Sequence, residues 1–302
     1  MAKKTNTKID DLVKLKKVIG DINKFMPGVN IDFANKAPDK KKLFFGVKDI
    51  DKLTGGIQCG NFTVIYGSES SGKSTLALSA IADAQKNRKM CMYIDLEHSF
   101  EKKRAKILGI DLSKLLLVEN IQNAEESMDI VKKVSQEAIV DFIVVDSIQA
   151  MSPKGEQETK AGKEKSIESD EIALLARKMG KFLRVSGSAV HNGKVAVLMI
   201  GQIRTGGLGT FIVKSTLSGG NAIKHWSVLT LFMRRGQKAD APTVKEKVDG
   251  KTKQKIVGFD SVIKIEKTKV SDSMCENSDL HLPFYLLTGY NQEEIGEIND
   301  KL

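Results

Sequence analysis

Residues 67–75, GSESSGKST, match the phosphate-binding loop pattern G-x-x-x-x-G-K-[ST]. An apolar run, NFTVIY, precedes them, and a helix-forming segment, TLALSAIADAQ, follows. In this setting Gly67 and Gly72 let backbone N–H groups surround phosphates. Lys73 then reaches the β- and γ-phosphates, and Ser74 offers its hydroxyl to Mg²⁺. A Gly/Ser-rich turn that matches by chance is the alternative, but the flanking strand and helix favour a nucleoside triphosphate site.

The composition is that of a globular chain. Its 302 residues, 41% of them hydrophobic, suffice for one large α/β domain with appendages, or for two domains. No run of about 18 apolar residues occurs, and MAKKTNTK leads into a charged segment rather than a signal peptide's apolar core. We therefore expect a cytoplasmic protein that contacts no membrane. The isolated cysteines lack metal-ligand spacing and are expected to be reduced thiols: Cys59, Cys91 and Cys275.

A basic segment precedes the phosphate loop. The chain carries a net charge of +10, and residues 1–42 contribute eleven Lys against five Asp. This charge favours polyanionic partners, although basic surfaces also occur on proteins that bind no nucleic acid. Residues 1–42 are predicted to form a helical arm that contains an amphipathic helix ending by Pro27, and either the chain's own core or a neighbouring subunit would cover the apolar side of this helix. The apolar residues on that side are Ile9, Leu12, Val13, Ile19 and Ile22.

From residue 43 onward, apolar strands alternate with helix-like segments. This pattern predicts a parallel sheet covered on both faces, in a domain that spans residues 43–302. The expected strands are FTVIYG, MCMYIDLE, DFIVVDS, KVAVLMIGQ, SVLTLFMRR, DSVIKIEKTKV and HLPFYLLTG, and the expected helices are 75–87, 124–138 and 168–186. Residues 236–258 contain Pro242 and an Asp249–Gly250 turn signal, which predict an exposed hairpin or loop.

Two carboxylates end predicted strands. Asp146 closes DFIVVD, at a position where a carboxylate of a phosphoryl-transfer site orients the Mg²⁺ shell. The alternative for Asp146 is a cap on a strand-to-helix turn. Glu97 ends MCMYIDLE, where it could act as general base toward a water that attacks the γ-phosphate. A strand-end carboxylate without a catalytic role is an equally open alternative for Glu97.

Taken together, these motifs resemble the RecA family of recombinases, in its compact bacteriophage form. The resemblance covers roughly residues 43–290, through the joint order of IYGSESSGKSTLAL, IDLEH, VDFIVVDS, LLARKMGKFLR, GQIR, GGNAIKHW and EKTKV. It implies a RecA-like P-loop ATPase core, which is an α/β fold with a central, mostly parallel sheet flanked by helices, preceded by the short helical arm. The cofactors that it implies are ATP and Mg²⁺.

The resemblance also assigns roles to residues of the nucleotide site. Besides Lys73, Glu97 takes the position of the catalytic glutamate, and Gln202 that of the γ-phosphate sensor. Lys267 and Lys269 match paired lysines that reach a neighbouring subunit's ATP, although the alternating pattern alone favours lysines that face solvent. The implied metal ligands are Ser74 and, through water, Asp146. The implied cofactor contacts are Gly67, Ser68, Glu69, Ser70, Ser71, Gly72, Lys73, Ser74, Thr75, Arg104 and Asp146.

Two segments are expected to bind DNA. Residues 153–168 are polar without apolar periodicity and match the first DNA-binding loop of the family, and residues 203–221 match the second. The apolar residues of the second loop would leave it disordered in water without a partner. Phosphate contacts should make binding independent of sequence and sensitive to salt. The implied contacts are Arg177, Arg184, Arg204, Leu208, Phe211, Lys214, Gly219, Gly220 and Asn221, with a solvated helix face as the alternative for the first two.

The sequence departs from the family pattern at three places. Arg104 stands where many relatives have an aromatic residue that stacks on adenine, which leaves nucleotide selectivity open. Lys224 and His225 are expected at the subunit interface, and His225 replaces an aromatic residue of bacterial relatives. The sequence ends at Leu302, so we expect the C-terminal domain of bacterial relatives to be missing and its capture of duplex DNA to be absent or to fall to another element, such as the arm.

The resemblance implies an ATP-dependent recombinase that acts in DNA recombination, in DNA repair and in the response to DNA damage. Such a DNA-dependent ATPase forms helical filaments on single-stranded DNA, pairs it with homologous double-stranded DNA and exchanges strands, with single-strand-binding or mediator proteins as further partners. One alternative is a ring-forming DNA helicase or repair translocase on the same core, distinguished by closed hexamers and directional unwinding. The other is a non-enzymatic switch that binds nucleotide with negligible turnover.

Overall fold

The chain divides into two compact units, Met1–Lys40 and Lys41–Leu302. The computed structural model describes the following residues: 3–26, 29, 31–36, 39–157, 174–206, 214–217, 221–238, 243–248, 251–256, 258–270 and 279–285. None of the helices in this described part has the length and apolar character needed to cross a membrane.

The first unit consists mainly of helix α1, Lys3–Phe25, with a short 3₁₀ turn η1, Ala34–Lys36. The helix ends before Pro27, as the sequence predicts. Asn23 ties the helix to the segment that follows, because its side chain accepts from Ile31 N at 3.0 Å and donates to Ile31 O at 3.2 Å. Several large apolar side chains of this unit are exposed, among them Leu12, Val13, Leu15, Val18 and Phe25.

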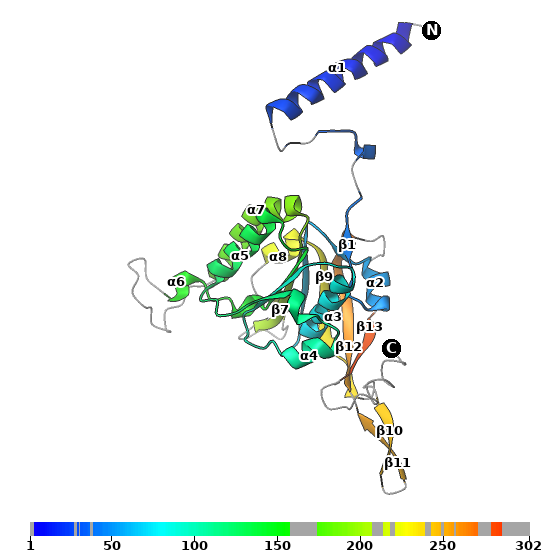
Figure 1. The fold of residues 1–302 in the computed structure, drawn as a ribbon, viewed down its shortest axis with the longest axis vertical. Helices are drawn as coiled ribbons and strands as arrows, with labels where there is room; N and C mark the ends of the chain where they lie inside the picture. Colours follow the sequence, from blue (N-terminus) through cyan, green and yellow to red (C-terminus); the bar gives the residue numbers. More distant parts are fainter. Residues whose placement is uncertain are drawn as a thin grey trace. The chain divides into compact units, whose positions relative to one another are not determined.

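The second unit is built on one large sheet (Figure 1). Its strand order is β13-β12-β9-β3-β7-β6-β4-β5, with β8 paired to β7. The strands from β9 to β5 in this order are parallel to one another, whereas β12, β13 and β8 pair antiparallel. The predicted mostly parallel α/β sheet is therefore confirmed. The bounds are β3 Phe62–Gly67, β4 Cys91–Asp95, β5 Leu115–Val118, β6 Phe142–Asp146, β7 Ala196–Gly206, β8 Lys214–Leu217, β9 Ser227–Arg235, β12 Gly258–Thr268 and β13 Leu280–Tyr285.

Helices cover both faces of the sheet, because alternate residues of each buried strand point to opposite faces. Ile65 of β3 packs in the cluster that contains Leu76 and Ile81 of α3, whereas Val64 and Tyr66 pack in the cluster with residues of α5 and α7. Figure 1 shows α5 and α7 together on one side of the sheet. The helices are α2 Lys48–Thr54, α3 Lys73–Lys86, α4 Lys102–Ile107, α5 Ala124–Glu137, α6 Lys154–Gln157, α7 Leu174–Gly193 and α8 Asn221–Trp226, with 3₁₀ turns η2 Leu112–Lys114 and η3 Ile148–Ala150.

The remaining strands form two small sheets. β1 Lys42–Leu43 pairs antiparallel with β2 Ile57–Gln58. β10 Thr243–Val248 and β11 Lys251–Ile256 pair antiparallel, which confirms a hairpin between residues 236 and 258. β5 is absent from the predicted strands, because its four-residue run LLLV is too short for periodicity to separate it from a helical segment.

A test of the packing between α5 and α7 uses two glycines of α7. A Cβ at Gly193 would lie 2.1 Å from the Ser135 backbone oxygen of α5, whereas at Gly180 its nearest contact is Ala222 Cβ at 3.6 Å. We expect Gly193→Ala to lower the free energy of unfolding by about 1–3 kcal/mol through overpacking. The control Gly180→Ala should be neutral, or stabilising by up to about 1 kcal/mol through helix propensity. Urea unfolding followed by circular dichroism measures both changes, and equal effects would contradict this packing.

Candidate nucleotide-binding site

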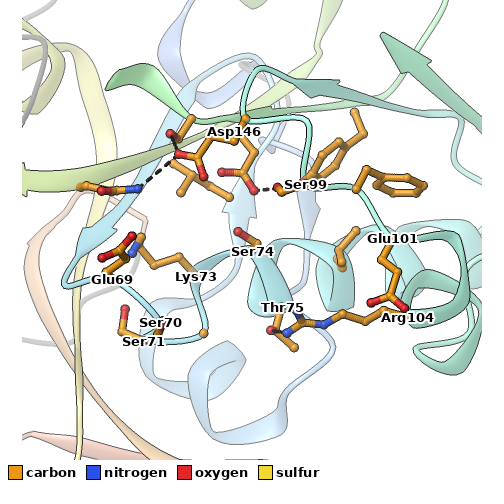
Figure 2. A pocket seen from close by; sticks show the side chains of 18 of the residues that line it. Glu69, Ser70, Ser71, Lys73, Ser74, Thr75, Ser99, Glu101, Arg104 and Asp146 are labelled. Carbon is orange, nitrogen blue, oxygen red and sulfur yellow. Dashed lines mark hydrogen bonds between the residues drawn. The ribbon is translucent and has the colours of Figure 1, made fainter. Parts of the chain in front are cut away.

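A pocket of about 480 Å³ lies where the carboxyl ends of several parallel strands meet (Figure 2). Ligands of open α/β sheets bind at this edge. Figure 2 shows Lys73 and Arg104 toward opposite ends of the pocket, with Ser74 between them. The lining residues are Glu69, Ser70, Ser71, Gly72, Lys73, Ser74, Thr75, Leu78, Tyr93, Glu97, Ser99, Phe100, Glu101, Arg104, Asp146, Ser147, Ile200, Gln202, Arg235 and Phe259.

The phosphate loop connects β3 to α3 and follows the predicted strand–loop–helix order. Gly72 precedes α3 with φ +89°, a left-handed conformation that glycine adopts without strain. Within the loop, Ser71 Oγ donates to Ser68 O at 2.8 Å, and Ser261 of β12 donates its hydroxyl to Ser71 O. Among the described residues, the buried Ser68 Oγ has no hydrogen-bond partner. A polar ligand in the loop would supply one, so this orphaned hydroxyl supports the assignment of a phosphate site.

Lys73 is a buried cation of this loop, with 7% of its surface exposed. Its Nζ donates to Ser68 O at 2.6 Å and to Gly67 O at 3.4 Å. Burial lowers the pKa of Lys73, and the opposing effect of the Asp146, Glu97 and Glu69 carboxylates is smaller. Burial of an ammonium that has no carboxylate among its hydrogen-bond partners is unfavourable in free energy, and a phosphate oxygen would compensate its charge.

The two predicted Mg²⁺ ligands lie together. Asp146 at the end of β6 is 1% exposed and accepts from Tyr93 OH at 2.6 Å. Burial raises the pKa of Asp146, whereas its hydrogen bonds with Ser74 and Tyr93 act in the opposite direction. A serine hydroxyl beside a carboxylate is an oxygen donor set that suits Mg²⁺. These two residues therefore fit the metal that the sequence predicts.

Glu97 and Gln202 also meet in the pocket. Gln202 Nε2 donates to Glu97 Oε1 at 3.2 Å, and Ser147 donates its hydroxyl to the same carboxylate oxygen. Gln149 accepts from the Gln202 backbone N–H at 2.8 Å and so fixes β7 at this position. Gln202 pairs in register with Gly67, so it lies beside the start of the phosphate loop. The arrangement joins a carboxylate that can orient water to a strand that leads directly to residues 207–213.

Arg104 of α4 is placed at the far end of the pocket from Lys73. Its guanidinium donates to the hydroxyl of Thr75, the last residue of the predicted phosphate loop. Asp95 holds the turn before α4, because its carboxylate accepts from Ser99 N at 3.2 Å and Phe100 N at 2.8 Å. Arg104 therefore presents a fixed, planar cation to the region beyond the phosphates, where a base would lie.

Arg235 and Phe259 line the pocket but are absent from the predicted site. Arg235 ends β9, and its guanidinium carbon lies 4.9 Å from the centre of the Phe259 ring, a cation–π contact. The signal for Arg235 is present in the sequence, since it is a polar residue at the carboxyl end of an apolar strand, as Gln202 is. Phe259 carries no such signal, because β12 runs antiparallel and brings its start, rather than its end, to this edge.

Other predicted residues lie away from the pocket. Lys267 donates to the backbone oxygens of Lys224 and His225, and neither Lys267 nor Lys269 is among the residues that line the cavity. Arg177 and Arg184 are exposed on α7, seven positions apart. The backbones of Arg204, Lys214 and Asn221 belong to β7, β8 and α8, but their side chains lie outside the described part. Leu208, Phe211, Gly219 and Gly220 lie outside it entirely.

The two predicted DNA-binding loops are not irregular throughout. Residues 154–157 at the start of the first loop form α6, and residues 158–168 lie outside the described part. In the second loop, Ile203–Gly206 pairs antiparallel with Lys214–Leu217. The prediction of an unstructured 203–221 is therefore wrong at both of these flanks. β-Branched residues such as Ile203 and Thr205 favour strand pairing, and the edge of β7 offers free backbone groups there.

These features define a P-loop nucleotide-binding protein with a mostly parallel α/β sheet. The family model of the RecA N-terminal domain matches residues 39–279. Protein RecA of Nautilia profundicola is 39% identical over 192 residues, 63% of this chain and 53% of that protein. For protein RecA of Acinetobacter baumannii the identity is 34% over 253 residues, 83% and 66% of the two chains. Protein RecA of Wigglesworthia glossinidia brevipalpis is 35% identical over 240 residues, which are 78% of this chain and 67% of that protein.

The chain belongs to the RecA family, and the predicted family resemblance is confirmed. Its matching part spans about half to two thirds of the length of these curated relatives. Arg104 and His225, where the sequence departs from the family pattern, both lie in the described part, the first in the pocket and the second exposed at the end of α8.

The buried lysine provides a direct test of the site. We expect Lys73→Ala to abolish ATP hydrolysis and to weaken ATP binding by about 1.5–3 kcal/mol, the usual contribution of hydrogen bonds to a charged group. Thermal unfolding should show an intact fold. Lys86→Ala, at the exposed opposite end of α3, is the matched control and should behave as the unmodified protein. Unchanged hydrolysis in Lys73→Ala would contradict the assignment.

Proposed function

We propose that this chain is an ATP-dependent DNA recombinase. ATP with Mg²⁺ would favour a helical filament on single-stranded DNA, which pairs with a homologous duplex and exchanges strands. The observation that carries the proposal is the hydrogen bond between Gln202 and Glu97 in a pocket that also contains the buried Lys73. It joins a candidate hydrolytic carboxylate to the strand that leads into the predicted second DNA-binding loop. Membership of the RecA family supports this interpretation.

The proposed chemistry gives the phosphates, the Mg²⁺ ion and the attacking water each their own residues in the pocket. The N–H groups of the phosphate loop and the ammonium of Lys73 would bind the β- and γ-phosphates. Ser74 and Asp146 would hold Mg²⁺, which supplies neutralisation of the charge that develops on the transferred phosphoryl group. Glu97 would orient the attacking water and accept its proton, a role worth roughly 10²–10⁴-fold in rate. Gln202 would exchange its contact with Glu97 for the γ-phosphate and so report the nucleotide state along β7.

The base would lie beside Arg104, at the end of the pocket away from Lys73. A guanidinium stacks on any planar base, whereas hydrogen-bond donors fix which base is preferred. Arg104 is held by Thr75, so its plane is available without a large entropic cost. This arrangement supports nucleotide binding without selecting a base, and ATP is the proposed substrate because the chain belongs to the RecA family.

Assembly would complete the site from a second subunit. Lys267 and Lys269 stand outside the chain's own pocket, which fits lysines that act on a neighbour's nucleotide. A head-to-tail interface of this kind generates a helical filament when its rotation does not close. The exposed apolar residues of α1 would then be covered by the neighbouring subunit. Lys224 and His225 would lie at the same interface.

DNA binding is assigned to the two predicted loops and to α7. Arg177 and Arg184 are both exposed, and their spacing of seven residues places them on one face of the helix. Contacts of this type go to phosphates and carry little sequence information. The relatives reported above are bacterial, so the bacteriophage type stays a prediction.

The function is tested by strand exchange between a single-stranded circle and a homologous linear duplex. We expect joint molecules only with ATP and Mg²⁺, and none with a heterologous duplex. Single-stranded DNA should raise the rate of ATP hydrolysis. This rise should become smaller with increasing salt, because Lys and Arg side chains that bind DNA phosphates displace counterions from the DNA, and added salt opposes that displacement.

Electron microscopy of the same mixtures distinguishes the alternatives. Helical filaments on single-stranded DNA support the recombinase. Closed rings that unwind a duplex directionally would instead indicate a helicase or translocase. Nucleotide binding with negligible turnover in the presence of DNA would indicate a nucleotide-dependent switch, and either result would overturn the proposal.

A further inference from the structure

Helix α8 begins at the end of the predicted second DNA-binding loop, leads into β9 and packs against β3 and α7. It starts at Asn221, the last residue of the predicted second DNA-binding loop, and it runs without a spacer into β9. Ile223 is fully buried and anchors the helix in the core cluster that it shares with Val64 and Tyr66 of β3. Trp226 at its end packs against Gly187 of α7, where a Cβ would lie 3.1 Å from the indole ring. Ile223 and Trp226 therefore hold α8 against β3 and α7.

Lys224 of α8 forms a closed hydrogen-bonded triad with Tyr66 and Glu266. Its Nζ donates to Tyr66 OH at 2.6 Å and forms an ion pair with Glu266 Oε2 at 2.8 Å. Tyr66 OH in turn donates to Glu266 Oε1 at 2.5 Å. The Lys224 Nζ also lies 4.5 Å from the centre of the Tyr66 ring. Because Tyr66 immediately precedes Gly67, the triad connects α8 to the start of the phosphate loop.

A β-bulge in β12 brings two consecutive side chains to α8. The pairing of β12 with β9 shifts between Ile265 and Lys267, and Glu266 has no partner in the register. Neighbouring residues of a regular strand point to opposite faces of the sheet. A bulge changes this direction locally and re-aims a side chain. Glu266 contacts the side chain of Lys224 here, and Lys267 contacts the backbone of the same residue.

Lys267 is docked on the carboxyl end of α8. Its Nζ donates to Lys224 O at 2.6 Å and to His225 O at 2.8 Å, which are carbonyls of the last turn. Lysines commonly bind the free carbonyls of a helix end. Burial lowers the pKa of Lys267, with a smaller contribution from Lys269. The ammonium therefore depends on these two carbonyls for its position.

We propose that Tyr66, Lys224 and Glu266 are positioning residues that fix Lys267 through α8 and thereby couple the second DNA-binding loop to the lysines of the subunit interface. Displacement of the loop on DNA moves Asn221 and the rest of α8, and Lys267 moves with the carbonyls that hold it. The triad transmits the same displacement to the phosphate loop through Tyr66. This inference rests on the proposed function for the role of Lys267, but not for its position.

The first experiment measures the position of Lys267 without DNA or nucleotide. Limited acetylation with an N-hydroxysuccinimide ester, read by mass spectrometry, reports how accessible and reactive this lysine is. We expect Tyr66→Phe and Glu266→Gln each to change the acetylation rate of Lys267 by roughly threefold or more, the fold-change expected for loss of a partly exposed charged contact. The matched control is Asp141→Asn, which breaks the Lys89–Asp141 ion pair of 2.9 Å at similar exposure.

The second experiment measures coupling, as the ratio of ATP hydrolysis with and without single-stranded DNA. The ratio should fall at least about threefold in Tyr66→Phe and Glu266→Gln, as expected when a contact of this size is lost, and stay at the unmodified value in Asp141→Asn. An unchanged acetylation rate in both variants would overturn the positioning role. A changed rate with an unaltered ratio would overturn the coupling alone. If the unmodified protein shows no stimulation by DNA, the proposed function fails, whereas acetylation still decides the positioning role.

Discussion

The backbone oxygen of Met233 in β9 would lie 1.7 Å from a Cβ at position 67, so β3 can end there only in glycine. This approach lets Ser68 N donate to Met233 O at 3.1 Å, which turns the chain away from the sheet. The phosphate loop follows, and α3 begins at Lys73. The turn is central to the pocket because β3 lies between β9 and β7, and Gly67 pairs in register with Met233 and Gln202.

The parallel block of the sheet distributes the site over several strand ends. Asp146 ends β6, Arg235 ends β9, and Gln202 of β7 lies beside the end of β3, so the three residues meet near one edge although they are far apart in the sequence. Lys73 and Asp146 are both less than a tenth exposed. Burial lowers the pKa of Lys73 and raises the pKa of Asp146. In a buried site of low dielectric, the electrostatic contact between each charged side chain and a bound phosphate would be stronger than in water. The same low dielectric makes a charged side chain unfavourable when no opposite charge is bound beside it.

The sequence predicts most of this sheet, because FTVIYG, FIVVD and SVLTLFMRR are continuous apolar runs that end in glycine or polar residues. It also predicts the grouping of Lys73, Asp146 and Glu97, since carboxyl ends of parallel strands share an edge. It does not predict the partners of Tyr66, which reads as one more apolar strand residue. Those partners come from residues 224 and 266 through the tertiary fold, and the β-bulge that places Glu266 has no pattern of its own.

We propose that a second subunit completes the nucleotide site, and a mixture of two inactive variants tests this proposal. Lys73→Ala lacks the phosphate-loop lysine, whereas a chain with Lys267→Ala and Lys269→Ala lacks the lysines of the opposite side. In an equal mixture of the two on single-stranded DNA, about a quarter of head-to-tail interfaces combine both intact halves. We expect ATP hydrolysis well above that of either variant alone, toward a quarter of the unmodified rate. Hydrolysis no higher than that of the separate variants, or full activity without Lys267 and Lys269, would contradict it.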